Sequence, residues 1–154
     1  MPDQLSVSRE IRVPADRVWA MVADVTRMGE WSPETVGCTW LGKATGPAKG
    51  AKFRGTNRNG TKEWKTVATV VDCDPGRVFA FAVNAMGMGI SEWRYTFEPT
   101  TSGCRVTESW TDRRNGLLKK LSPRASGVTD RAGRNRETME QTLERLAAAA
   151  EAGP

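Results

Sequence analysis

Histidine is absent from all 154 residues of the chain. Its absence removes the commonest general base, the usual metal ligand, and every catalytic arrangement that pairs histidine with serine or cysteine. We therefore expect no metal site and no other cofactor. Any acid or base chemistry has to come from another residue type.

Cysteine is scarce as well. Cys38, Cys73 and Cys104 are odd in number and widely spaced, and a domain of this size does not need disulfides to fold. We expect them to be reduced residues of the core or the strands. The chain also lacks a basic start followed by an apolar stretch, and it has no run of about 18 apolar residues. A cytoplasmic location is therefore expected.

Hydrophobic periodicity predicts a strand and two helices at the start of the chain. Apolar residues alternate over Leu5–Val13, which is typical of a strand with one buried side. Pro14 suits the first turn of a helix because it has no amide hydrogen to leave unpaired. A short second helix follows, with Asp24 or Thr26 as its cap, and it ends before Pro33.

Between residues 37 and 110 the apolar period changes to two, and turn residues separate the runs. This pattern predicts six further strands, at about Gly37–Leu41, Ala51–Arg58, Lys62–Asp72, Arg77–Val83, Ile90–Glu98 and Cys104–Thr111. A polar segment, Asp112–Val128, then precedes a long helix at about Thr129–Ala150. Trp64 and Val67 fall on opposite faces of the fourth strand, so its phase stays open, and a β-bulge would explain both.

A sheet with one solvated face must bury the other, and the final helix is the only large cover available. We therefore predict an α+β fold in which a curved antiparallel sheet of about seven strands wraps round the C-terminal helix. Two short helices follow the first strand. Residues 1–154 are expected to form a single domain with a core of about 5–150, since domains usually have about 100–200 residues.

Four stretches of the sequence carry a resemblance to a known family: Val13–Trp19, Met28–Glu34, Trp93–Pro99 and Gly103–Trp110. Together they resemble the polyketide cyclase/dehydrase (lipid transport) family of the START-like (SRPBCC) superfamily, in its actinobacterial form, over Leu5–Ala150. The resemblance implies a helix-grip (Bet v 1-like) fold that encloses a hydrophobic cavity. It does not imply one activity, because START-like relatives include lipid carriers, aromatic polyketide cyclases, hormone receptors and co-chaperones.

Glu108 is the leading candidate for a functional polar group. It alternates with the polar side chains of the last strand, so we expect it to point inward, where a carboxylate is costly unless it is bonded or protonated. Tyr95 and Asn135 are expected to point toward the same cavity and to orient a ligand. Each of the three has a structural alternative. For Glu108 it is a rim glutamate held by arginine or a satisfied structural network, for Tyr95 a core tyrosine whose hydroxyl bonds to protein, and for Asn135 a solvated residue near the helix start.

Inward-facing apolar side chains are expected to line the cavity, because ligand pockets are mostly apolar and aromatic with few polar groups. The predicted lining residues are Trp31, Trp40, Phe53, Trp64, Phe79, Phe81, Trp93, Tyr95, Trp110, Asn135, Met139 and Leu143. The alternative is that these residues form a plain packed core.

Positive charge is concentrated between Arg113 and Arg136, where eight basic residues oppose one acidic residue, a balance of 8 − 1 = +7 against +5 for the whole chain. Within it, Leu117–Leu121 mixes leucines with lysines, a composition typical of segments that touch an anionic membrane. The alternative is a solvated lid whose leucines pack on the sheet edge. Nucleic acid is not expected, because no recognised binding motif accompanies the charge.

Three functions are compatible with these features. The first is a carrier that holds a lipid, fatty-acid-derived or polyketide-like molecule without covalent chemistry. The second is a cyclase, dehydratase or hydrolase in which Glu108 acts as acid or base. The missing histidine and the lack of a second inward carboxylate favour binding. The third is a protein-interaction module, co-chaperone or toxin-like, that uses the basic Arg113–Arg136 surface; monomer and homodimer both stay open.

Overall fold

The computed structural model describes residues 4–153. Seven strands form one sheet, and their bounds are β1 (Gln4–Ile11), β2 (Thr35–Trp40), β3 (Lys52–Asn59), β4 (Lys62–Asp74), β5 (Val78–Ala85), β6 (Met88–Pro99) and β7 (Cys104–Asp112). The helical elements are α1 (Ala15–Ala23), the 3-10 helix η1 (Val25–Glu30), α2 (Gly116–Ser126) and α3 (Arg131–Glu151). None of the helices within residues 4–153 is long and apolar enough to cross a membrane.

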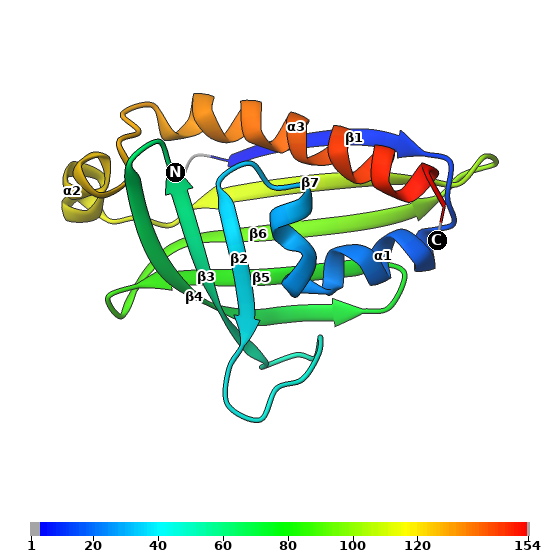
Figure 1. The fold of residues 1–154 in the computed structure, drawn as a ribbon, viewed down its shortest axis with the longest axis horizontal. Helices are drawn as coiled ribbons and strands as arrows, with labels where there is room; N and C mark the ends of the chain where they lie inside the picture. The colour runs from blue at the N-terminus through cyan, green and yellow to red at the C-terminus, as the bar shows by residue number, and fades with distance from the viewer. Residues whose placement is uncertain (1–3, 154) are drawn as a thin grey trace.

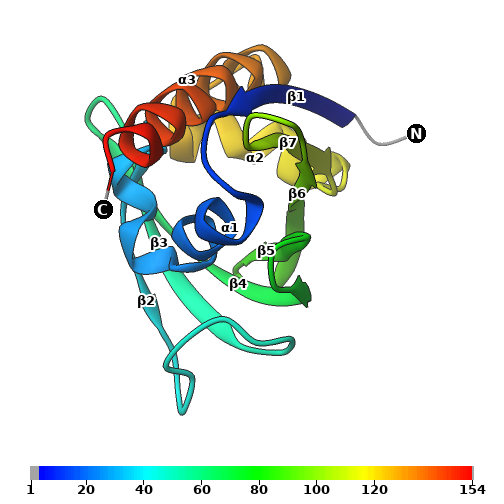
Figure 2. The same cartoon turned by 90° about the vertical axis from the view of Figure 1, so that its right-hand side faces the viewer.

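The sheet is antiparallel throughout and has the order β1-β7-β6-β5-β4-β3-β2. Strands β2 to β7 therefore form a meander, and β1 pairs with the last strand. Figures 1 and 2 show the sheet curving round, with α3 lying across its open side and α2 at the end of the molecule where α3 begins. The predicted α+β helix-grip fold is confirmed.

The two halves of α3 bury different kinds of side chain, apolar in the C-terminal half and partly polar in the N-terminal half. Its C-terminal half contributes Leu143, Leu146, Ala147 and Ala150 to the main hydrophobic core, and each fully buried leucine stabilises the fold by roughly 1.5–3 kcal/mol. Its N-terminal half buries polar side chains, beginning with Asn135. The core therefore fills one end of the space between sheet and helix and leaves the other end for a cavity.

Regular alternation sets the phase of β4 around Trp64 and Val67, because the register with β3 runs there without a shift, and the β-bulge lies farther along the strand. Trp64 and Ala68 face the cavity, so Val67 between them faces the other side. The register with β5 shifts between Val70 and Asp72, which inserts one residue and turns the end of the strand.

The segment Asp112–Val128 differs from expectation, because it contains α2 rather than a polar segment without a helix. The Asn115 side chain caps the helix by accepting from the Leu118 amide at 2.9 Å. Gly127 ends it with a left-handed φ of 74°, a conformation in which glycine has no steric cost. Other element boundaries shift by a few residues; β1, for example, ends at Ile11 rather than Val13.

Candidate ligand-binding cavity

A cavity of about 400 Å³ lies between the sheet, α2 and the N-terminal half of α3. Residues of every strand from β2 to β7 contribute to its wall. Its volume falls within the range of about 300–1,000 Å³ that is usual for small-molecule sites. The alternative of a plain packed core is therefore wrong for this half of the molecule.

The predicted lining residues fall into two groups. Those that line the cavity are Phe53, Trp64, Phe81, Trp93, Tyr95, Trp110 and Asn135. Apart from Trp64, whose strand had no clear phase in the sequence, they come from strands with clear alternation and from the first half of α3.

The second group does not line the cavity, which corrects the prediction for Trp31, Trp40, Phe79, Met139 and Leu143. Trp31, Phe79 and Leu143 belong to the hydrophobic core, and Trp40 packs against it. On α3 the apolar stripe that includes Met139 and Leu143 is buried, while the neighbouring stripe of Asn135, Thr138 and Thr142 faces the cavity. Adjacent stripes of a helix form different faces. The prediction that the apolar stripe of α3 lines the cavity was therefore wrong, and the neighbouring polar stripe lines it.

Glu108 is buried, with 3% of its surface exposed, and lies in the cavity wall. It sits opposite Tyr95 in the β6–β7 register, and the Tyr95 hydroxyl donates to Glu108 Oε2 at 2.8 Å. Glu108 Oε1 has no hydrogen-bond partner among the described residues. The alternative of a rim glutamate held by arginine is wrong, since the described part of the chain supplies Glu108 with no ion pair.

Burial controls the protonation of this pair. It raises the pKa of Glu108 to about 8, and the hydrogen bond from Tyr95 opposes the rise only in part. Burial and the neighbouring Glu108 carboxyl also raise the pKa of Tyr95 well above its usual value. At neutral pH Glu108 is therefore mostly a neutral acid. With Oε2 accepting from Tyr95, the O–H of the acid at Oε1 is available to a molecule in the cavity.

A second carboxylate, Asp112, is buried on the same face of β7, which corrects the prediction that Glu108 is alone. Arg114 Nη2 lies 2.8 Å from Asp112 Oδ2, and Arg114 Nε donates to Oδ1 at 2.9 Å. Burial opposes ionisation of Asp112, but the hydrogen bonds and charge of Arg114 outweigh it, so the pKa lies below its ordinary value. Arg114 also donates to the Ser122 hydroxyl on α2 at 2.9 Å.

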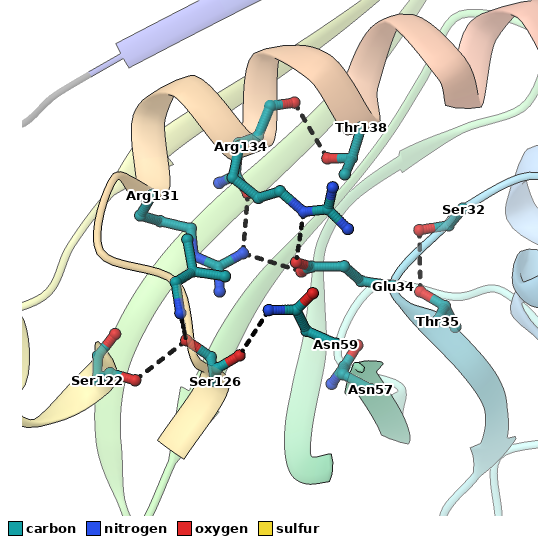
Figure 3. A network of polar contacts seen from close by, with 12 residues as sticks. Ser32, Glu34, Thr35, Asn57, Asn59, Ser122, Ser126, Arg131, Arg134 and Thr138 are labelled. Atoms are coloured by element: carbon teal, nitrogen blue, oxygen red, sulfur yellow. Dashed lines mark hydrogen bonds and ion pairs between the residues drawn. The ribbon is translucent and has the colours of Figure 1, made fainter. Parts of the chain in front are cut away.

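A second polar network borders the cavity, as Figure 3 shows. Glu34 accepts from Arg131 Nη1 at 2.9 Å and from Arg134 Nε at 3.3 Å. The Arg131 guanidinium also lies over the Trp64 ring, 5.8 Å from its centroid. Asn135 lines the cavity as expected, but its Oδ1 accepts from Arg131 at 3.2 Å rather than bonding Glu108.

Threonines on the cavity face of α3 are satisfied within the helix. The Thr138 hydroxyl donates to the Asn135 carbonyl at 3.1 Å, and the Thr142 hydroxyl donates to the Thr138 carbonyl at 2.7 Å. Their methyl groups are therefore the parts available to a ligand. Glu108 Oε1 is left as the buried side-chain oxygen without a partner within residues 4–153.

The cysteines offer no reactive site. All three are free thiols, and burial raises the pKa of Cys38, which lines the cavity, to about 11. A thiol that stays protonated is a poor nucleophile. Within the described residues, no group of three cysteine, aspartate or glutamate side chains is arranged to hold a metal ion.

Comparisons with known proteins agree on the fold. A polyketide-cyclase-like protein of Corynebacterium glutamicum is 30% identical, with 99% of this chain and 85% of that chain covered and a TM-score of 0.56. A protein of Mesorhizobium loti is 16% identical over 99% of both chains, with a TM-score of 0.72. The di-domain ARO/CYC StfQ from the steffimycin biosynthetic pathway is 14% identical over 98% of this chain and 52% of that chain, with a TM-score of 0.75.

The two structures with the lower identities support the fold alone. Among curated proteins, nothing matches the chain. The actinobacterial form that the motifs suggested stays a prediction. The family model for polyketide cyclase/dehydrase and lipid transport proteins, however, matches residues 2–151. The chain belongs to the polyketide cyclase/dehydrase and lipid transport family.

Proposed function

We propose that the protein binds an apolar small molecule, lipid, fatty-acid-derived or polyketide-like, and that Glu108 donates a hydrogen bond to an oxygen of that molecule. The observation that carries the proposal is the unpartnered, buried Oε1 of Glu108 in the wall of the cavity. A buried polar group without a partner costs roughly 1–3 kcal/mol. A ligand carbonyl or hydroxyl oxygen placed there would offset that cost.

The surrounding wall supports an apolar ligand. Phe53, Phe81, Trp93 and Trp110 line the same cavity as Glu108. Large apolar surfaces supply affinity, and one well-placed polar group fixes orientation. The satisfied threonines of α3 add to the apolar lining, so we expect one acceptor oxygen in the ligand to be recognised deep in the cavity.

A second function, acid-base catalysis of the cyclase or dehydratase type, is favoured by one observation. The pKa of Glu108, at about 8, lies close to neutral pH, where an acid can both give and take a proton efficiently. The raised pKa of Tyr95 keeps its hydroxyl as a donor that orients the carboxyl. Catalysis would require a reacting oxygen or carbon within reach of Oε1.

Native mass spectrometry of the purified protein, followed by organic extraction, tests binding directly. We expect a co-purifying apolar molecule, or uptake of a hydrophobic dye by the empty protein. A Glu108→Leu variant removes the donor, so affinity should fall by about tenfold. Glu98→Gln, on the exposed side of β6, is the control that should bind normally.

A Glu108→Gln variant distinguishes ligand binding from acid-base catalysis. An amide retains a donor but cannot exchange a proton, so binding should persist within a few-fold. A carrier then shows no turnover to lose, whereas an enzyme keeps its ligand and loses its turnover. A protein that is empty as purified and takes up no hydrophobic dye contradicts both functions.

A further inference from the structure

Three of the four large exposed apolar side chains of the described residues lie at one end of the molecule. The large exposed hydrophobic residues within residues 4–153 are Met86 (82% exposed), Leu117 (58%), Val36 (49%) and Leu121 (42%). Met86 and Leu121 also border the cavity, and Leu117 lies on the same helix as Leu121. Figure 1 shows α2 and the β5–β6 turn at the same end of the molecule.

A tight turn holds Met86 in this position. Ala85 pairs with Met88, so Met86 and Gly87 alone connect β5 to β6, with φ angles of 51° and 75°. This geometry favours asparagine, aspartate or glycine at the first position. A methionine there is disfavoured by the backbone, yet its side chain is almost fully exposed. A residue that the backbone conformation disfavours, with an exposed apolar side chain, motivates a functional explanation.

Helix α2 has two faces. Its inner face places Leu118 and Ser122 against the cavity. The adjacent stripe is exposed and carries Leu117, Lys120, Leu121 and Arg124 at helical spacing. This stripe mixes leucine with positive charge, as amphipathic helices at membrane surfaces do.

The positive charge of α2 is uncompensated. Of the basic residues between 113 and 136, four are held by acidic partners: Arg113 by Glu92, Arg114 by Asp112, and Arg131 and Arg134 by Glu34. No ion pair within residues 4–153 involves Lys119, Lys120 or Arg124. The unpaired part of the basic surface expected from the sequence is therefore α2 together with the exposed Arg136 on α3.

We propose that this end of the molecule docks on an anionic lipid bilayer. Met86, Leu117 and Leu121 enter the interface, and the three basic side chains of α2 meet the headgroups. The apolar residues argue against nucleic acid, which basic and polar groups bind. Docking in this orientation turns the cavity toward the bilayer. The exchange of a ligand through the docked face rests on the proposed function, whereas docking itself does not.

Co-sedimentation of the full chain with vesicles tests docking. We expect binding to phosphatidylcholine vesicles that contain phosphatidylglycerol, little binding to phosphatidylcholine alone, and weaker binding as salt is raised. Each cationic side chain near an anionic surface contributes about fivefold to the affinity. Lys119→Glu with Lys120→Glu should therefore lower binding at least tenfold. Lys43→Glu with Lys49→Glu, in the exposed β2–β3 loop, is the matched control that should bind as wild type.

A second set of variants tests how much the exposed apolar side chains contribute to vesicle binding. Met86→Asn with Leu117→Gln should lower binding several-fold, and asparagine suits the turn, so misfolding does not explain a loss. Val36→Thr removes exposed apolar surface on β2 and is the control. Absence of binding to anionic vesicles at low salt overturns the proposal, as does equal binding by the α2 charge variant. Glu108→Leu should dock normally while losing ligand affinity, which separates failure of docking from failure of the proposed function.

Discussion

Glu108 and Asp112 are two buried carboxyl groups on the same face of β7, yet their pKa values move in opposite directions. Burial raises the pKa of Glu108 to about 8, and the one hydrogen bond that it accepts, from Tyr95, offsets this rise only in part. The pKa of Asp112 falls because Arg114 binds both of its oxygens. Burial opposes ionisation of both groups, and only Asp112 has a guanidinium whose hydrogen bonds and charge outweigh that effect.

On β7, Asp112 has a structural role, whereas Glu108 is the candidate for a functional one. Asp112 has its hydrogen bonds met, and through Arg114 and Ser122 it ties the end of β7 to α2. Glu108 faces the cavity, and its Oε1 has no hydrogen-bond partner among the described residues. Two carboxyl groups with displaced pKa values are often an acid-base pair, but an aspartate locked by arginine is not free to exchange protons.

The largest expected effect comes from removing the guanidinium. Arg114→Met leaves a carboxylate with no exposed surface without its cation, and breaking such a pair costs about 3–5 kcal/mol of unfolding free energy. Urea unfolding at neutral pH measures it. The double variant Asp112→Asn with Arg114→Met should recover part of the loss, whereas a single variant as stable as wild type would show that the pair is not buried in solution.

Stability should also depend on pH through Glu108. The folded state holds a proton on Glu108 up to about pH 8, while an ordinary glutamate releases it near 4.5. The folded state thus binds more protons between these values, so unfolding free energy falls as pH rises from about 4.5 to about 8, by at most about 1.4 kcal/mol per pH unit. The Glu108 contribution is the difference between wild type and Glu108→Gln across this range; a flat difference refutes it.

How far the sequence predicts the site depends on the range of the interaction. Alternation along single strands was enough to turn Tyr95 and Glu108 inward, and antiparallel pairing of neighbouring strands then set them opposite each other. The Glu34–Arg131 contact joins residues 97 positions apart, and no local pattern signals it. Asp112 was missed because the last strand continues one residue beyond the expected end at Thr111.

Helix α2 shows a second reason for failure. Pro123 and the many polar residues weaken its helical pattern, so the segment was expected to be irregular. Its helicity depends on the Asn115 cap and on the packing of Leu118, which requires the assembled sheet. Asn115, two residues before the apolar pair Leu117 and Leu118, was the available signal for a helix start.

Removing the phenol has a moderate effect. Tyr95→Phe leaves Glu108 Oε2 without its donor, so unfolding free energy should fall by about 1–3 kcal/mol. Because that hydrogen bond lowers the pKa of Glu108, its loss should raise the pKa further. Urea unfolding and the pH profile of stability measure the two effects. An unchanged pKa together with unchanged stability would mean that the hydrogen bond does not form.

The smallest change in unfolding free energy is expected for a substitution on the outer face of β7. The Thr107 hydroxyl lies 2.8 Å from the Ser8 hydroxyl in an exposed hydrogen bond. Thr107→Val should change unfolding free energy by no more than about 0.5 kcal/mol, with the pH profile of wild type. A loss as large as that of Tyr95→Phe would remove the distinction between the two faces of β7.

Titration of the Glu108 carboxyl group is the decisive measurement for the proposed hydrogen-bond donor. Infrared difference spectra of wild type against Glu108→Gln isolate the signal of this carboxyl group. We expect a protonated acid at pH 7 and a titration midpoint at about pH 8. A midpoint near the ordinary value of 4.5 would contradict this expectation, because a charged Glu108 has no proton to donate to a ligand.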